Sequence, residues 1–520
     1  MFTRMSRKAS SRREVLSKFL PLCVAAGALG LSGCSSITPH ALSTQELQGL
    51  QREAATQARQ GVEPITHPLT LEEALARAFK YNLNQRAQLM EEAIALNVWD
   101  AGRFDMLPRA LATAGYHTRS HDLVTRSQDS VTGQPSLAHP YISSDRTYET
   151  ADLGFSWSVL DFTVGYYNAK QNADRALIAS EHRRKAMHTL GRDVTVAFWR
   201  MASAQRLLDD VKRTISSAES ALADAAQAQG LRSPADGLRY QRQLLENLRL
   251  LSNIEKEFSE GRVTLATLIN APIGQEFTVA ESDTKPSAQI LEISAERMEE
   301  AALLQNADLK EQAYNERIAA QEVRKSIAKL LPNLSLDESL RHSTDSFLIN
   351  KSWNEAGLLL SQNLTALLSA PANHRMAKAG VALAKQRRIA AQMALVAQVH
   401  IARLEVASTY QQLQYADRIW DLDERLNRLT SDREDAQAES RLAKISADTS
   451  AIVSRLRRYQ ALAEFQGAIG ALQSTLGLQI DLGSVNDLSL DDLVKAIGKW
   501  ERSWDAGQLP ESPATSNFSS

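Results

Sequence analysis

Apolar residues first recur at helical spacing over residues 71–106. Leu71, Ala74, Leu75, Ala78 and Phe79 share one face of a helix with 3.6 residues per turn. Thr70 precedes this run as an N-cap, with Glu72 and Glu73 in the first turn. The pattern predicts an amphipathic helix that ends before Pro108.

The period then changes to two. Apolar and small residues alternate over 111–117, and Leu153, Phe155, Trp157 and Val159 alternate with Gly154, Ser156 and Ser158 after a polar loop. A period of two with one large apolar face is typical of a half-buried strand. The sequence therefore predicts two strands, at 111–117 and 153–160.

A much longer helical pattern follows from Val164 to Gln229, where Gly and Pro are scarce. At 1.5 Å per residue, such a helix would reach about 100 Å, far more than the width of a globular domain. Gly230 breaks it, and a turn through Ser233 and Pro234 leads to a second helix from Asp236 to Ile269. Together these segments predict a long helical hairpin.

The second half of the chain repeats this plan. It has a helical pattern over 296–329, strand-like pieces near 333–340 and 356–364, a helix over 372–441, a turn at 442–447 and a helix over 448–476. Leu107-Pro108 recurs as Leu331-Pro332, an offset of 224 residues (332 − 108). The ordered matches indicate an internal duplication.

The paired strands point toward a membrane. Strands enter a bilayer only as a closed barrel, because every backbone N–H and C=O must be paired there. Four strands per chain cannot close a barrel, since known barrels need about eight or more, whereas three copies would supply about twelve. In that case Leu153, Phe155, Trp157 and Val159 form the lipid-facing side. The alternative is a small soluble sheet that caps the helices.

The composition of the N-terminal segment indicates that the chain is exported. Arg4, Arg7 and four further basic residues precede an apolar run from Phe19 to Leu31, which is too short to span a bilayer. This is the pattern of an export signal, so residues 1–33 are expected to be removed. Without them the chain has 53 basic and 60 acidic residues, a charge of −7, which disfavours nucleic acid as a partner. No stretch beyond Cys34 has 18 consecutive apolar residues, so no transmembrane helix is expected.

The signal ends in Leu31-Ser32-Gly33-Cys34. These residues resemble the lipobox of bacterial lipoproteins, in which the cysteine is acylated, palmitate included, and becomes the first mature residue. Cys23 lies within the signal, so Cys34 would be the only mature thiol. Ser11-Arg12-Arg13 also resembles a twin-arginine signal, and both this route and ordinary Sec export stay open.

Several segments together resemble the TolC-like outer-membrane efflux protein family. They are the lipobox, the duplicated plan, "LTLEEALARAFKYN" at 69–82, "SWSVLDF" at 156–162 and "TLINAPIG" at 267–274. The resemblance implies a mainly α fold with a small β part, in which duplicated long-helix hairpins form a trimeric α-helical barrel continuous with a 12-stranded outer-membrane β-barrel. Asn270 and Ala271 stand where the family usually has a Gly before the proline.

The domain organisation follows from these segments. We expect a cleaved signal at 1–33, a lipidated linker at 34–68, a first repeat at 69–275, a second repeat at 276–480, and a C-terminal helix and flexible tail at 481–520.

The resemblance also implies partners and sites. The partners are two further copies of the chain, outer-membrane lipid, a periplasmic adaptor and an inner-membrane pump. The helix–helix turns would meet the adaptor or form a periplasmic gate, at Gly230, Leu231, Arg232, Ser233, Asp236, Leu442, Ala443, Lys444, Ser446 and Asp448. Asp448 is either a gate residue or a helix N-cap. Arg455, Arg457 and Arg458 are either a cationic pore lining or a solvated face paired to acids.

Motifs of enzyme chemistry are absent from the sequence. It contains no H-E-x-x-H, G-x-x-x-x-G-K-[ST], C-x-x-C or G-x-S-x-G, and its ten histidines are scattered. We therefore predict no catalytic, cofactor or metal site. The leading hypothesis is the export channel of a tripartite efflux or type I secretion system. The alternative is a lipid-anchored periplasmic coiled-coil scaffold without a pore.

Overall fold

The computed structural model describes residues 41–509, except 137–138, 228–233, 273, 281–285, 437–439, 479–484 and 486. The chain divides into two units, Met1–Gly61 and Val62–Ser520. The described part of the first unit contains the helix α2 (Thr44–Arg59). Ser43 and Glu46 cap it reciprocally through a capping box, so part of the expected linker at 34–68 is helical.

The second unit contains two similar sets of elements, which correspond one to one except for η1 (Phe104–Met106), found in the first set alone among the described residues. The first repeat consists of α3 (Leu71–Tyr81), α4 (Leu83–Arg103), η1 (Phe104–Met106), β1 (Arg109–Thr118), β4 (Thr147–Ser158), α5 (Val159–Gln227) and α6 (Pro234–Leu268). The second consists of α7 (Ala295–Gln305), α8 (Ala307–Ala328), β5 (Asn333–Ser343), β6 (Ser352–Ser361), α9 (Leu364–Asp435) and α10 (Arg441–Leu476). A small hairpin of β2 (Val124–Thr125) and β3 (Tyr141–Ile142), the turn η2 (Gln289–Glu292) and α11 (Leu490–Asp505) are additions.

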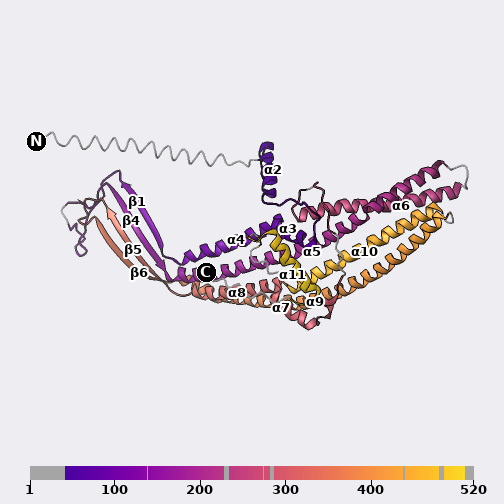
Figure 1. Cartoon of the computed structure of the whole chain (residues 1–520). Coiled ribbons are helices and arrows are strands. Elements are labelled where there is room, and N and C mark those ends of the chain that lie inside the picture. The colour runs from indigo at the N-terminus through magenta and orange to yellow at the C-terminus, as the bar shows by residue number, and fades with distance from the viewer. Residues whose placement is uncertain are drawn as a thin grey trace. The chain divides into compact units, whose positions relative to one another are not determined.

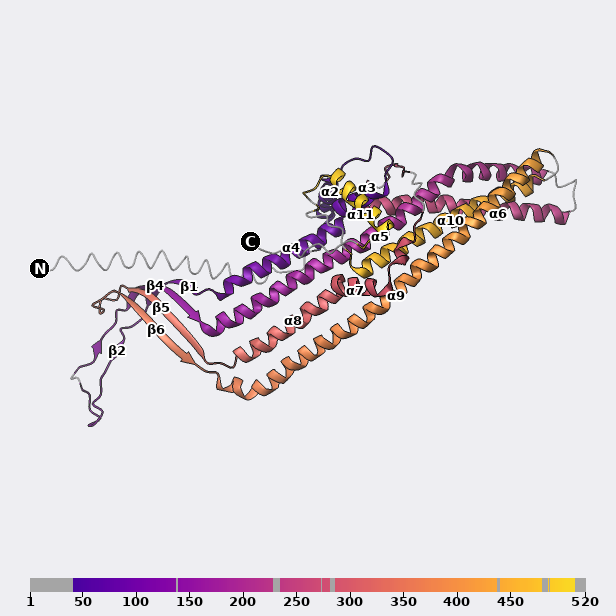
Figure 2. The ribbon, with the colours of Figure 1, turned by 60° about the horizontal axis from the view of Figure 1, so that its bottom comes forward.

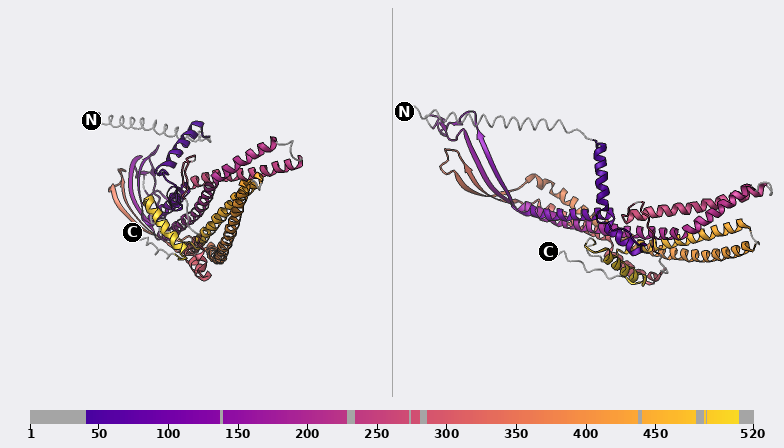
Figure 3. Two further views of the ribbon diagram at one scale, coloured as in Figure 1. Left: turned by 45° about the vertical axis from the view of Figure 1, so that its right-hand side comes forward. Right: turned by 45° about the horizontal axis from the view of Figure 1, so that its top comes forward.

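The two repeats pack side by side throughout. The sheet is antiparallel in the order β1-β4-β5-β6, and the helices that continue from these strands pack in the matching order α4-α5-α8-α9. Beyond them the order is α6-α5-α10-α9, because α5 and α9 run on while α6 and α10 return along them. Within this unit the sheet lies at one end of the helices and the α5–α6 and α9–α10 hairpins lie at the other (Figure 1, Figure 2, Figure 3).

Each repeat has a helix break that the sequence pattern did not predict. The helices expected over 71–106 and 296–329 are interrupted at Asn82 and Asn306, which are again 224 residues apart. Each side chain caps the helix that follows, and its Nδ2 donates to a backbone carbonyl at the end of the returning helix, of Leu268 at 2.9 Å and of Thr475 at 3.0 Å. The breaks therefore depend on contacts across the fold, which periodicity does not detect.

The returning helices also end alike. Asn270 has φ +55° and Gly477 has φ +70°, so each repeat terminates in a left-handed residue. Asn tolerates this conformation better than other residues with a Cβ, which explains how it replaces glycine after α6. At Gly477 a Cβ would lie 2.5 Å from the Gln305 carbonyl oxygen, so only glycine fits there.

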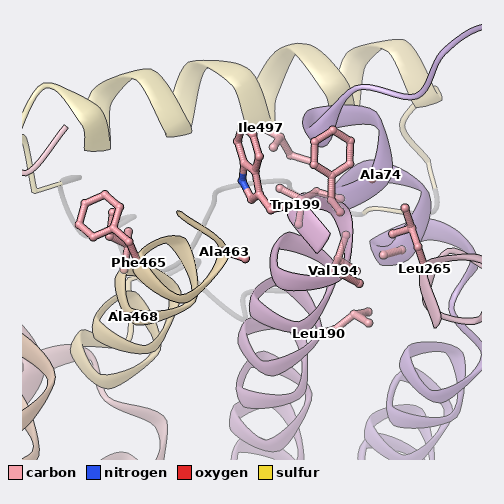
Figure 4. Close-up of a cluster of buried hydrophobic side chains, with 14 of the residues drawn as sticks. Ala74, Leu190, Val194, Trp199, Leu265, Ala463, Phe465, Ala468 and Ile497 are labelled. Carbon is pink, nitrogen blue, oxygen red and sulfur yellow. The ribbon is translucent and has the colours of Figure 1, made fainter. Parts of the chain in front are cut away.

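The main apolar core lies where α3, α7 and α11 cover α5, α6, α9 and α10. We name it the belt core. Thr70 caps α3 as predicted, and Leu69 pairs with residues 278–280, which ties the start of the first repeat to the segment that follows α6. Figure 4 shows representative side chains of the belt core, Ala74, Leu190, Val194, Trp199, Leu265, Ala463, Phe465, Ala468 and Ile497.

Candidate functional site

The sheet has two chemically different faces. Residues that lie directly opposite in antiparallel strands point to the same side, so the register assigns every side chain to a face. Leu153 pairs with Ala112 and with Leu340, and Phe155 pairs with Ala110. Leu336 pairs with Trp157 and with Leu358, which carries the same face across all four strands.

The first face is mainly apolar where it adjoins the helices. Its apolar members there are Ala110, Ala112, Leu153, Phe155, Trp157, Leu334, Leu336, Leu340, Ala356, Leu358 and Leu360. Two polar residues interrupt it, Glu338 opposite Phe155 and Asn354 opposite Leu340. Leu358 and Leu360 are 70% and 68% exposed on this chain, so no other part of the described chain covers them. The predicted grouping of Leu153, Phe155 and Trp157 agrees with the register. Val159 does not belong to it, because it is the first residue of α5 rather than a strand residue.

The second face is mainly polar. Its polar members include Thr113, His117, Tyr148, Thr150, Asp152, Ser335, Asp337, Ser339, Arg341 and Glu355, and its large apolar members are Leu111, Trp353 and Leu359. Thr113 donates to Asp152 across β1 and β4 at 3.4 Å, and Arg341 forms an ion pair with Glu355 at 3.2 Å. Such hydrogen-bonding groups favour contact with water.

The strands that border the sheet are β1 and β6, and each pairs on one side only within the described residues. An unpaired edge exposes a row of N–H and C=O groups. The strands have 10 to 12 residues, which matches a tilted bilayer-spanning strand. A two-faced sheet of this length therefore needs neighbouring strands before it can enter lipid.

The tip of the first repeat is described in part. Gly230, Leu231, Arg232 and Ser233 lie outside the described residues, and Asp236 is in the first turns of α6. Cys34 also lies outside the described residues.

The tip of the second repeat differs from the prediction. The turn expected at 442–447 is helical, because α10 begins at Arg441 with Ser440 as its N-cap, whose hydroxyl accepts from the Ala443 amide. Leu442 and Ile445 pack against Ala218 and Leu244 of the first repeat, which holds this turn in the helix. The expected start of the helix at 448 was therefore seven residues late.

The candidate tip residues of α10 contact the neighbouring helices α6 and α9. Lys444 forms an ion pair with Glu434 of α9 at 3.2 Å, and the Ser446 hydroxyl accepts from Asn247 of α6 at 3.4 Å. Leu442 packs against Ala218 and Leu244, and the backbone amide of Ala443 donates a hydrogen bond to the Ser440 hydroxyl. These residues join α10 to α6 and α9.

Asp448 is an interior helix residue, so it is not an N-cap. It lines a hollow between α5, α9 and α10 together with Asp210, Asn427 and Arg455. Burial raises the pKa of its carboxyl group, and Asp210 adds to the rise, whereas Asn427 and Lys444 oppose it.

The basic cluster after Asp448 is largely paired. Arg455 contacts Asp210 at 3.1 Å, and Arg458 forms an ion pair with Asp417. Both guanidinium groups also lie over the ring of Trp420, at 5.6 and 5.0 Å from its centroid. Arg455 and Arg458 thus have the acidic partners that the second interpretation predicted.

Two further features bear on function. Among the described residues no group of three or more His, Cys, Asp and Glu side chains can hold a metal ion. By length and composition α9 could cross a membrane, with a mean hydropathy of 1.2 over 18 residues, although it contains no run of 18 consecutive apolar residues. Core helices of soluble proteins also meet this criterion, and α9 packs against α8 and α10.

Comparison with solved structures identifies the architecture. A membrane protein from Pseudomonas aeruginosa superimposes with a TM-score of 0.62 at 16% identity, over 81% of this chain and 92% of that chain. The CmeC outer membrane channel of Campylobacter jejuni gives 0.61 at 13% identity, over 82% and 89%. The open state of the MtrE outer membrane channel of Neisseria gonorrhoeae gives 0.58 at 16%, over 79% and 94%.

This chain has the TolC-like outer-membrane channel fold. The resemblance noted from the sequence is confirmed at the level of the fold, as is the prediction of a mainly α chain with a small β part. No protein-family model and no curated protein matches the sequence. In the TolC-like fold the two-faced sheet and the helical tips are the two ends of one duplicated unit.

Proposed function

We propose that this chain is the outer-membrane channel of an export system. The observation that carries the proposal is the four-stranded sheet, with an apolar face, a polar face and two open edges, which continues directly into the long helices. Three copies would close about twelve strands into a barrel with the polar face inward, and so satisfy the edge groups of β1 and β6.

The same proposal assigns the location and partners. The chain is exported, acylated at Cys34 and held in the outer membrane chiefly by its barrel, with the helices in the periplasm. The helical tips, with Gly230–Ser233 and Asp236 in the first repeat and residues 442–448 in the second, meet a periplasmic adaptor, and an inner-membrane pump supplies the energy. The TolC-like fold and the similarity to the CmeC and MtrE outer membrane channels support this arrangement. Drug efflux and type I secretion remain the two candidate pathways.

Conductance tests the channel directly. The purified full chain should run as a heat-modifiable trimer on gels and give discrete conductance steps in planar bilayers. The competing function is a lipid-anchored scaffold, which the exposed helix surfaces would also allow. A monomer without conductance would establish the scaffold and remove the channel.

The lipid anchor has its own test. The variant Cys34→Ala cannot be acylated, and we expect it still to form conducting trimers, because the barrel spans the membrane. Cys23→Ala is the matched control, since it changes the cysteine inside the signal. A wholly soluble Cys34→Ala protein would contradict the barrel as the main anchor.

Cross-linking tests the adaptor contact. A photo-reactive amino acid at Ser233 is expected to capture the adaptor, whereas the same group at Thr132, in the loop between β1 and β4, is not. Equal capture at both positions would contradict the tip as the docking site.

A further inference from the structure

A cavity of about 490 Å³ lies in the belt, away from both the sheet and the helical tips. Residues of α3, α5, α10 and α11 line it. Its apolar wall is aromatic, with Phe79, Phe198, Trp199, Trp500 and Trp504. The side chains of Trp199 and Ile497 meet in the adjoining belt core (Figure 4). A volume of this size accommodates a drug-sized molecule.

Four buried nitrogen atoms of this wall lack hydrogen-bond partners among the described residues. The indole Nε1 atoms of Trp199, Trp500 and Trp504 and the Nε2 atom of His188 are buried, and none has a hydrogen-bond partner among the described residues. Trp199 and Trp504 are 7% and 3% exposed. An unsatisfied buried donor costs about 1–3 kcal/mol, so three unpaired indole N–H groups and an unpaired imidazole nitrogen around one cavity are unusual for a space that only fills the interior.

The charges around the cavity are unbalanced. Glu72 of α3 and Glu501 and Asp505 of α11 line it. The arginines of α5 are paired elsewhere, Arg184 with Glu181 and Arg192 with Asp193 at 2.9 Å. Among the described residues, Arg502 of α11 is the remaining cation of the wall. That part of the wall thus has three carboxyl groups and one guanidinium group that is not already in an ion pair.

We propose that this cavity binds a small organic cation, whose apolar body lies against the indole and phenyl rings and whose charge lies beside the Glu501 carboxylate. Aromatic faces attract cations, and a desolvated carboxylate attracts one more strongly than an exposed one. The unpaired indole N–H groups are available to acceptor atoms of the same ligand or to water that accompanies it. The proposal is independent of the channel function, since binding is measured on the purified chain without transport.

The electrostatics supply a signature of binding. Burial raises the pKa of Glu501 to about 8, with Glu72 and Asp505 adding to the rise and Arg502 opposing it. His188 titrates near 4, because burial and the charge of Arg184 lower its pKa, so it stays neutral above pH 6. Burial also raises the pKa of Asp505. A bound cation favours the ionised form of Glu501, so affinity should rise with pH up to about 8 and then level off.

Ethidium, a planar aromatic cation, is a suitable probe for the full chain in detergent. Fluorescence anisotropy should show saturable binding of one ethidium per chain, accompanied by quenching of tryptophan fluorescence. Phenanthridine has the same ring system without the charge, and 8-anilinonaphthalene-1-sulfonate is an aromatic anion. We expect ethidium to bind the most tightly of the three at pH 8.5.

Two glutamate variants distinguish the site from general attraction. Glu501→Gln keeps the shape of the protonated acid, and we expect it to weaken ethidium binding about tenfold at pH 8.5, to abolish the pH dependence and to leave phenanthridine unaffected. Glu464→Gln removes the same charge from an exposed position on α10 and should change nothing. Absence of saturable binding, equal affinity in wild type and Glu501→Gln, or tighter binding of the sulfonate would overturn the proposal.

Discussion

The sheet and the belt core use apolar side chains in opposite ways. In the belt core the side chains of Leu472, Phe465 and Val194 are fully buried, because helices of the same chain enclose them. In the sheet Leu336, Leu358 and Leu360 are more than half exposed, and their own chain leaves them uncovered. The belt therefore completes a core within one chain, whereas the sheet leaves its apolar surface exposed on that chain, as the proposed membrane barrel requires.

The largest expected effect contrasts one leucine from each region. Leu472→Ala removes a fully buried side chain and should lower the free energy of unfolding by about 2–5 kcal/mol, while Leu360→Ala on the sheet should cost less than about 0.5 kcal/mol. Denaturation of the detergent-solubilised chain, followed by circular dichroism at 222 nm, measures both. Equal losses would mean that the sheet is as enclosed as the belt core.

The next effect compares the two faces of the sheet at adjacent positions of β5. Leu336→Arg places a charge on the apolar face and should disfavour membrane insertion by about 2–4 kcal/mol, because lipid does not solvate it. Ser335→Arg places the same charge on the polar face and should insert normally but alter conductance. The fraction of heat-modifiable trimer in the outer membrane measures insertion. If Ser335→Arg fails and Leu336→Arg succeeds, the faces are assigned the wrong way round.

A smaller effect compares the repeats within the belt. Asn82→Ala and Asn306→Ala each remove a helix cap and a bond to a distant carbonyl, so each should destabilise by about 1–2 kcal/mol and by similar amounts. Thermal melting measures the change in Tm. The exposed Asn84 provides the control Asn84→Ala, which should leave Tm unchanged. A loss at one asparagine alone would show that the two breaks are not equivalent.

The smallest effect lies at the helical tip. Because burial raises the pKa of Asp448, its ionised form is disfavoured in the folded chain, and stability falls as pH rises from the ordinary value of 3.8 through the folded pKa. Asp448→Asn should therefore stabilise the chain at pH 8, by less than about 1 kcal/mol since the group is half exposed, and have no effect near pH 3. Melting curves at the two pH values measure this, and destabilisation at pH 8 would instead indicate that the charge is needed by its neighbours.

Much of the fold was predictable from local pattern. The Thr70 cap, the strand alternation at Leu153–Trp157 and the scarcity of Gly and Pro within α5 are local properties, so the sequence indicated each element within a few residues. The breaks at Asn82 and Asn306 were missed because their partners are 186 and 169 residues away. Their common offset of 224 residues was a signal that a search for paired asparagines would have found.

The candidate sites divide in the same way. The pairing of Arg455 and Arg458 with acids was among the predicted alternatives, because basic clusters on helices usually have acidic neighbours. The start of α10 was not predicted correctly, because Leu442 and Ile445 are held in the helix by Ala218 and Leu244 of the other repeat. The belt cavity was also missed, because its tryptophans come from helices about 300 residues apart.

The sequence by itself determined the type and length of the elements, their duplication and the chemistry of each strand face, because helical and strand periods are local. Only the tertiary structure decided the sheet register, which joins Leu336 to both Trp157 and Leu358 and so extends one apolar face over four strands. It also decided which polar groups find partners, since hydrogen bonds and ion pairs depend on distances between segments that periodicity does not encode.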